Sequence, residues 1–175
     1  MRVKPLIAIP LIAIALAGCS AQQPSPKETT AAADQKPLFA SDEEALAAAQ
    51  AAYANYLEVS DQIARDGGAN PERLKDVVTA DMYLSEKSTM DSYVEKNIFM
   101  QGNTLFDTSH IQSVTDHAVT MYLCLDTSQA GLSNLEGPVI GNTSDRWPLL
   151  VTMSADSSGT LLLSDSQTWS GTNFC

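Results

Sequence analysis

The chain has 175 residues, with 21 acidic against 10 basic side chains and a formal net charge of −11. Phosphate backbones are bound by clustered Lys and Arg side chains, and the few basic residues here are scattered, so nucleic acid is not an expected partner. We interpret the acidity as a solvated, self-repelling surface that favours solubility, rather than as an acidic binding face.

The first residues have the organisation of a secretory signal. Arg2 and Lys4 give a basic start, and an apolar run follows over residues 5–16. A membrane-spanning helix needs about 20 apolar residues, so this shorter run fits a removable signal. The alternatives are a true transmembrane anchor, or a signal cleaved elsewhere that leaves Cys19 as an ordinary thiol.

The residues Leu16-Ala17-Gly18-Cys19 resemble the lipobox of bacterial lipoproteins. The resemblance implies that residues 1–18 are a signal peptide and that the thiol of Cys19 carries diacylglycerol. Two or more acyl chains give stable anchoring. We therefore expect a protein held by lipid on the extracytoplasmic face of the cell membrane.

The mature chain is expected to begin with a tether and continue as one domain. Residues 19–40 comprise the lipidated Cys and a segment of Pro, Ser, Gln, Thr and Ala that is too poor in apolar residues to fold. Residues 41–175 have the length of a single compact domain, and no internal repeat is apparent.

With Cys19 carrying lipid, Cys124 and Cys175 are the remaining cysteines. An exported chain matures where disulfides form and persist, so the even pair is predicted to form one bridge. A redox-active pair is the alternative. Against it, there is no Cys-x-x-Cys spacing, and neither thiol has a His or Lys beside it in the sequence.

Three helices are expected in the first half of the domain. Ser41 and Glu44 form a capping box at the start of a long helix with apolar residues at three- and four-residue steps. Two consecutive glycines at positions 67 and 68 end it. Asn70 and Pro71 then open a short helix, and a third helical stretch is predicted over residues 79–100.

After Gly102 the pattern changes to that of strands. Four segments are rich in β-branched, apolar and aromatic residues and are separated by polar turns. They cover residues 104–115, 118–126, 148–155 and 160–169. Residues 156–159 are expected to form a hairpin turn, and residues 127–145 a long connection. Helices followed by antiparallel strands predict an α+β domain.

This element order resembles the cystatin-like cone of the nuclear transport factor 2-like superfamily, in which amino-terminal helices pack on a bent antiparallel sheet of about four strands. The closing string from Trp169 to Cys175 is similar to the ends of small actinobacterial lipoproteins of unknown function. The resemblance implies a pocket between helix and sheet, used in that superfamily for steroids, small metabolites or partner contacts. The aromatic candidates for lining a pocket, with core filling as the alternative, are Tyr53, Tyr93, Tyr122 and Trp169.

Enzymes of that superfamily commonly use an Asp base beside a Tyr or a second acid. The strand half offers Asp107, Asp116, Asp126 and Asp165. Each lies beside Ser or Thr at an expected strand end or turn, where solvation or a bond to the backbone is the simpler interpretation. A base would need to lie inside a cavity, close to a Tyr hydroxyl and away from any cation.

Other chemistry has little support in the sequence. His110 and His117 belong to no zinc-binding motif, and no Gly-x-Ser-x-Gly elbow places a nucleophilic serine. We therefore predict a membrane-anchored, non-catalytic binding or protein-interaction module, with no catalytic residues, metal or cofactor. Its expected partners are the membrane, through the diacylglycerol, and a cell-envelope protein or small apolar ligand. The alternative is a small-molecule enzyme of the same fold, with Asp-based proton transfer or hydrolysis.

Overall fold

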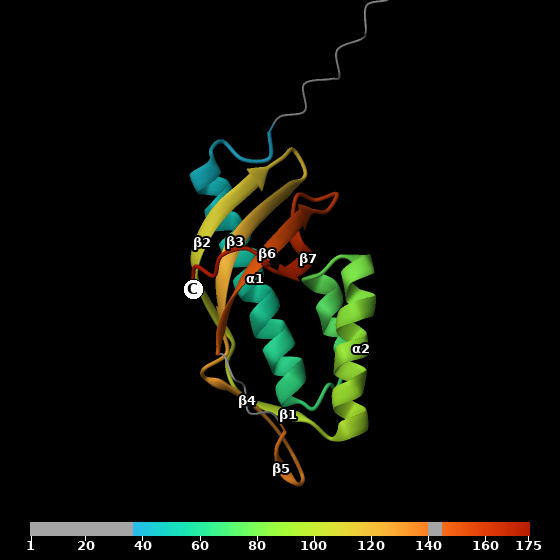
Figure 1. Ribbon diagram of the computed structural model, residues 1–175. Coiled ribbons are helices and arrows are strands. Elements are labelled where there is room, and N and C mark those ends of the chain that lie inside the picture. Colours follow the sequence, from blue (N-terminus) through green and yellow to red (C-terminus); the bar gives the residue numbers. More distant parts are fainter. Residues whose placement is uncertain (1–36, 140–144) are drawn as a thin grey trace, which may run out of the picture. The chain divides into compact units, whose positions relative to one another are not determined.

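The computed structural model describes residues 37–139 and 145–175 (Figure 1). The predicted signal peptide, the predicted lipidation site Cys19 and all but the end of the expected tether lie outside these residues. Within them, helices come first and antiparallel sheets follow, so the fold class is α+β, consistent with a cystatin-like cone. None of the helices in this part of the chain combines the length and apolarity needed to cross a membrane.

Helix α1 spans Asp42–Arg65 and begins where the capping box predicts. The Oγ of Ser41 accepts a hydrogen bond from the amide of Glu44 at 3.2 Å, while the Glu44 carboxylate reaches back to the amide of Ala40 at 2.8 Å. The first bond satisfies an amide that the helix leaves unpaired, and the second ties the residue before the N-cap to the first turn. The apolar stripe is buried along the helix, and its members include Ala45, Ala49, Tyr53, Leu57 and Ile63.

The third predicted helix is shorter than expected. After the short 3₁₀ helix η1 (Pro71–Asp76), helix α2 covers Ala80–Lys96. Asn97 adopts a left-handed backbone with φ 52°, and the amide of Ile98 bonds back to the carbonyl of Tyr93 at 2.9 Å. This is a common way for a helix to end. The prediction of helix through position 100 was therefore wrong, because strand β1 (Phe99–Gly102) follows at once.

The main sheet contains the four predicted strands. They are β2 (Leu105–Val114), β3 (Ala118–Asp126), β6 (Arg146–Ala155) and β7 (Leu161–Thr168), antiparallel in that spatial order. The predicted turn joins the last two strands. There Asp156 accepts from the amides of Ser158 and Thr160, and Gly159 supplies a left-handed φ of +88°.

A second, smaller sheet occupies the segment predicted as a long connection. Strands β4 (Ala130–Asn134) and β5 (Gly137–Pro138) form it together with β1, in the order β1-β4-β5. Its residues are largely small and polar, so no apolar alternation marks them as strands. The main-chain partner for β4 is β1, a distant segment that the sequence assigned to a helix.

The main sheet is bent and has two different faces. Register shifts interrupt the β2–β3 and β6–β7 ladders, and such β-bulges bend a sheet. On β3, the buried Val119, Met121 and Leu123 face α1, which packs against every strand of this sheet. Figure 1 shows α1 behind the sheet and the red closing segment crossing the opposite, outer face. The space under α1 is filled by side chains of the core.

Candidate functional site

A hollow of about 230 Å³ lies on the outer face of the main sheet. His110 of β2 and Tyr122 of β3 line it from the sheet, and these two residues are direct partners in the strand register. Trp169 and Phe174 line it from the closing segment. Four side chains with aromatic rings, from two strands and the segment that follows the last strand, therefore meet in one place.

The rings of this aromatic hollow stand at steep angles to one another. The Trp169 ring lies 5.0 Å from that of Tyr122, centroid to centroid, with an interplanar angle of 71°. The Phe174 ring lies 6.1 Å from the same tyrosine at 79°. Edge-to-face pairs of this kind are favourable beyond the area they bury. The hollow is therefore bordered by rings that contact one another at steep angles.

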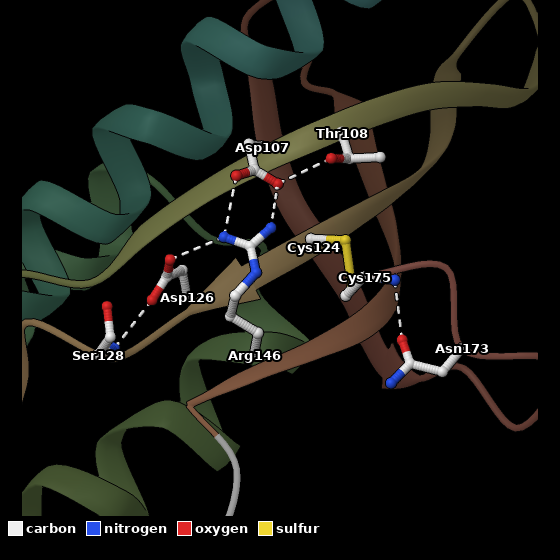
Figure 2. A network of polar contacts seen from close by, with 8 residues as sticks. All are labelled: Asp107, Thr108, Cys124, Asp126, Ser128, Arg146, Asn173 and Cys175. Carbon is white, nitrogen blue, oxygen red and sulfur yellow. Dashed lines mark hydrogen bonds and ion pairs between the residues drawn. A yellow bond between two sulfur atoms is a disulfide. The ribbon is translucent and has the colours of Figure 1, made fainter.

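Several contacts hold the closing segment on the sheet. The amide of Trp169 donates to the carbonyl of Pro148 at 2.9 Å, which continues the β6–β7 pairing beyond the end of β7. Near the end of the segment, the amide of Cys175 donates to Asn173 Oδ1 at 2.8 Å. The sulfur atoms of Cys175 and the buried Cys124 lie at disulfide distance, with their Cα atoms 5.5 Å apart (Figure 2). Phe174 thus sits beside a covalent staple.

An arginine clamp ties three strand ends together beside this staple (Figure 2). The Arg146 guanidinium donates two bonds to Asp107, at 2.7 and 3.0 Å, and one to Asp126 at 2.8 Å. The bonds from Arg146, followed by the one from Thr108, hold the pKa of Asp107 below its usual value. The pKa of Asp126 is also lowered, first by its bonds from Ser128 and then by Arg146.

The four candidate base residues are therefore placed as ordinary surface groups. Asp107 and Asp126 each form an ion pair with Arg146. Asp116 is exposed in the β2–β3 turn, and Asp165 accepts a hydrogen bond from Gln167 Nε2 at 2.6 Å. Asp107 and Asp126 therefore fail the criterion of a carboxyl away from any cation, and Asp116 fails that of burial in a cavity.

The two histidines lie in different surroundings. His110 lines the hollow, whereas His117 is exposed in the β2–β3 turn. Across residues 37–139 and 145–175, no group of three His, Cys, Asp or Glu side chains is arranged to hold a metal ion.

The structure brings together only two of the four residues predicted to line a pocket. Tyr122 and Trp169 share the outer hollow. Tyr53 is 2% exposed and fills the core, with its ring 5.1 Å from that of Phe106. Tyr93 lines a different hollow of about 310 Å³ near β1 and β4. The reason is that Tyr53 lies on the inward stripe of α1, while Tyr122 lies at an outward position of β3.

Two further lining residues were not predicted for this role. His110 was considered as a metal ligand, for which the sequence offered no motif, and Phe174 was not singled out. The signal for Phe174 is its position beside Cys175, because a bridge to the centre of the sheet must bring its neighbour onto the same face. The side of His110 depends on a bulge that has no local sequence signature.

Two carboxyls for which no role was predicted lie in or near the interior. Asp61 on α1 is 6% exposed and accepts bonds from the amide and hydroxyl of Thr104 at 2.7 and 3.0 Å. Glu86 on α2 accepts from the Tyr56 hydroxyl at 3.1 Å. Burial raises the pKa of both groups. Asp61 follows Leu57 by four residues, so helical spacing marks it as inward. Both carboxyls link helices to neighbouring elements.

Comparisons with known proteins show a similarity in fold and no relationship in sequence. No protein-family model matches the chain, and no curated protein matches its sequence significantly. Among solved structures, the intermembrane space region of the chloroplast protein ARC6 aligns with a TM-score of 0.55 and 12% identity, over 72% of this chain and 97% of that one. At this identity the likeness shows the fold alone.

Two structures of small α+β proteins from the actinobacterium Catenulispora acidiphila also align. One is described in complex with S-DNPA and gives a TM-score of 0.49 at 16% identity, over 69% of this chain and 89% of that one. The other gives 0.48 at 16% identity, over 70% and 89%.

Proposed function

We propose that this protein is a lipid-anchored, extracytoplasmic, non-catalytic module that binds an apolar group of a ligand or partner in the aromatic hollow on the outer sheet face. The observation that carries the proposal is the meeting of His110, Tyr122, Trp169 and Phe174 around one hollow. Binding sites are typically concave and mostly apolar, with a few placed polar groups.

The placement of the acidic groups supports binding over catalysis. A general base works best with a pKa near the operating pH, whereas the pKa values of Asp107 and Asp126 are lowered by their hydrogen-bond partners. Asp61 has a raised pKa, but both of its oxygens accept bonds from Thr104. Asp107 and Asp126 hold strand ends together through Arg146, and Asp61 holds helix α1 to the loop at Thr104.

The proposed location rests on the sequence before residue 41 and is tested by labelling. Cells expressing the full chain are grown with labelled palmitate, beside cells expressing Cys19→Ala. We expect label on the full chain and none on the variant, because diacylglycerol would be joined to that thiol. Absence of label on the full chain, or equal label on both, would overturn the lipid anchor.

The binding role is tested on the full chain in lipid nanodiscs by nuclear magnetic resonance. Small apolar probes such as tert-butanol and toluene are titrated while the aromatic resonances are followed. We expect shifts at Tyr122, Trp169 and Phe174, and weaker binding in Trp169→Ala. Phe99→Ala is the control, since Phe99 is 43% exposed on β1 and does not line the hollow. Shifts that avoid these three rings would overturn the assignment of the site.

A further inference from the structure

We propose that the aromatic hollow selects a quaternary ammonium group, such as the trimethylammonium of choline or of a choline-bearing lipid headgroup. This inference rests on the proposed binding role and specifies the chemistry of the ligand. It depends on three properties of the hollow, namely its ring arrangement, its few hydrogen-bond acceptors and the charge of its surroundings.

The hollow is open to solvent on one side and is lined by aromatic rings that stand in different orientations. Tyr122, Trp169 and Phe174 line the same space, and the latter two rings stand at 71° and 79° to the first. The face of an aromatic ring carries negative electrostatic potential and attracts a cation within about 6 Å of its centre. Rings in different orientations surround a compact cation better than parallel rings do.

The polar lining distinguishes between kinds of cation. A primary ammonium has three N–H donors that need acceptors, whereas the side chains lining this hollow offer acceptor atoms only on His110 and Tyr122 and include no carboxylate. Burying such a donor without a partner is costly. A quaternary ammonium has no N–H group and leaves no donor unsatisfied, so an open hollow lined mainly by aromatic rings suits it.

The surroundings are compatible with a positive ligand. The chain has a net charge of −11, and such a field attracts cations over long range. Nearby on the outer face, the Arg146 clamp sets two carboxylates, Asp107 and Asp126, against one guanidinium. The volume of about 230 Å³ is several times that of one water, about 30 Å³ in the liquid, so there is room for a compact methylated cation.

The test compares choline with 3,3-dimethylbutan-1-ol, the neutral alcohol in which carbon replaces the quaternary nitrogen. The full chain carries two Trp residues, so Trp147→Phe, a change at a partly buried position packed on the core, leaves Trp169 as the fluorescent reporter. Both compounds are titrated into this protein in phosphatidylglycerol nanodiscs, which contain no choline. We expect choline to bind about tenfold more tightly than the alcohol, the scale of a cation–π contribution.

A conservative variant separates ring electrostatics from folding. Phe174→Leu keeps an apolar side chain of similar reach and removes one ring face. We expect it to weaken choline binding by about threefold and to leave the binding of the alcohol nearly unchanged. Phe99→Leu, at an exposed aromatic outside the hollow, should alter neither affinity.

The outcomes separate this inference from the proposed function. If the alcohol binds as tightly as choline, or more tightly, the cation inference is wrong and the apolar binding site stands. If neither compound affects Trp169, both proposals fail. Repeating the choline titration in phosphatidylcholine nanodiscs identifies the source of the group. If the natural ligand is a lipid headgroup, phosphatidylcholine already occupies the hollow and added choline no longer changes the Trp169 fluorescence. If the natural ligand is a free cation, choline changes the fluorescence equally in both lipids.

Discussion

Asp107 and His110 lie on the same face of β2, although they are three positions apart. In a regular strand, side chains at this spacing point to opposite faces. Their partners on β3, Cys124 and Tyr122, are two positions apart, so β2 carries one extra residue between the two pairs. Thr108, with φ 52°, lies in this bulge. The bulge therefore allows one strand to supply both a carboxylate of the arginine clamp and a wall of the hollow.

The left-handed backbone of Thr108 in the bulge should strain the fold. Thr is β-branched and rarely adopts a left-handed conformation, which Asn tolerates better. Thr108→Asn should therefore raise the free energy of unfolding in urea by up to about 1 kcal/mol. Asn97, at the same φ of 52° after α2, offers the reverse change, and Asn97→Thr should lower stability by a similar amount. Two changes of the same sign would contradict a strain account.

The staple makes a prediction about stability. Cys124 and Cys175 are 51 positions apart, and a bridge of this span restricts the unfolded chain. Cys175→Ala should lower the free energy of unfolding by roughly 2–4 kcal/mol. Reduction of the unaltered protein should have the same effect, and reduction of the variant should add nothing. Equal urea midpoints for the oxidised protein and the variant would mean that the bridge does not form.

Gly171 makes a prediction about the shape of the hollow. A Cβ built at this position would contact the Trp169 indole at its Nε1 atom, whereas one built at Gly131 on β4 would meet nothing within 4 Å. Gly171→Ala should therefore displace the indole, shift its fluorescence and weaken probe binding, with little loss of stability because the ring moves toward solvent. Gly131→Ala should leave fluorescence and binding unchanged. Unaltered emission from Gly171→Ala would show that this packing is absent in solution.

The arginine clamp makes a prediction about acid stability. Folding lowers the pKa of Asp107, chiefly through Arg146, and also lowers the pKa of Asp126. The contribution of these two carboxylates to the stability of the fold is therefore complete above the pKa of an unfolded Asp, about 3.9. This contribution is lost as the pH falls through the lower pKa values that the two groups have in the folded protein. Arg146→Met should be less stable at neutral pH and lose less stability on acidification below about pH 4. Parallel pH profiles for the two proteins would argue against the clamp.

Much of the fold is local and could be predicted from the sequence. The Ser41 cap, the stripe of α1, the alternation along β3 and the Asp156 turn are each encoded within a few residues. The end of α2 at Asn97 was missed because an Asn in the left-handed conformation looks like any polar helix residue. The small sheet was missed because its pairing joins Met100 to Leu132 across the chain, and neither segment shows strand periodicity.

The site was only partly predictable for a related reason. Tyr122 and Trp169 could be singled out as large amphipathic rings, and the cysteine pair could be predicted from the expectation that the chain is exported. Which rings share a face depends on strand register, and the bulge at Thr108 resets that register for His110. Tyr53 was assigned to the same pocket because a helix stripe alone does not tell a core filler from a cavity wall.

The closing segment, held by Cys175, builds the hollow against Tyr122. Nuclear Overhauser contacts between aromatic rings test it directly in the full chain. In the oxidised protein we expect contacts from Tyr122 to both Trp169 and Phe174, and on reduction the Phe174 contacts should disappear while the core contact between Tyr53 and Phe106 persists. Absence of the Tyr122 contacts in the oxidised protein, or their survival in full after reduction, would contradict the account.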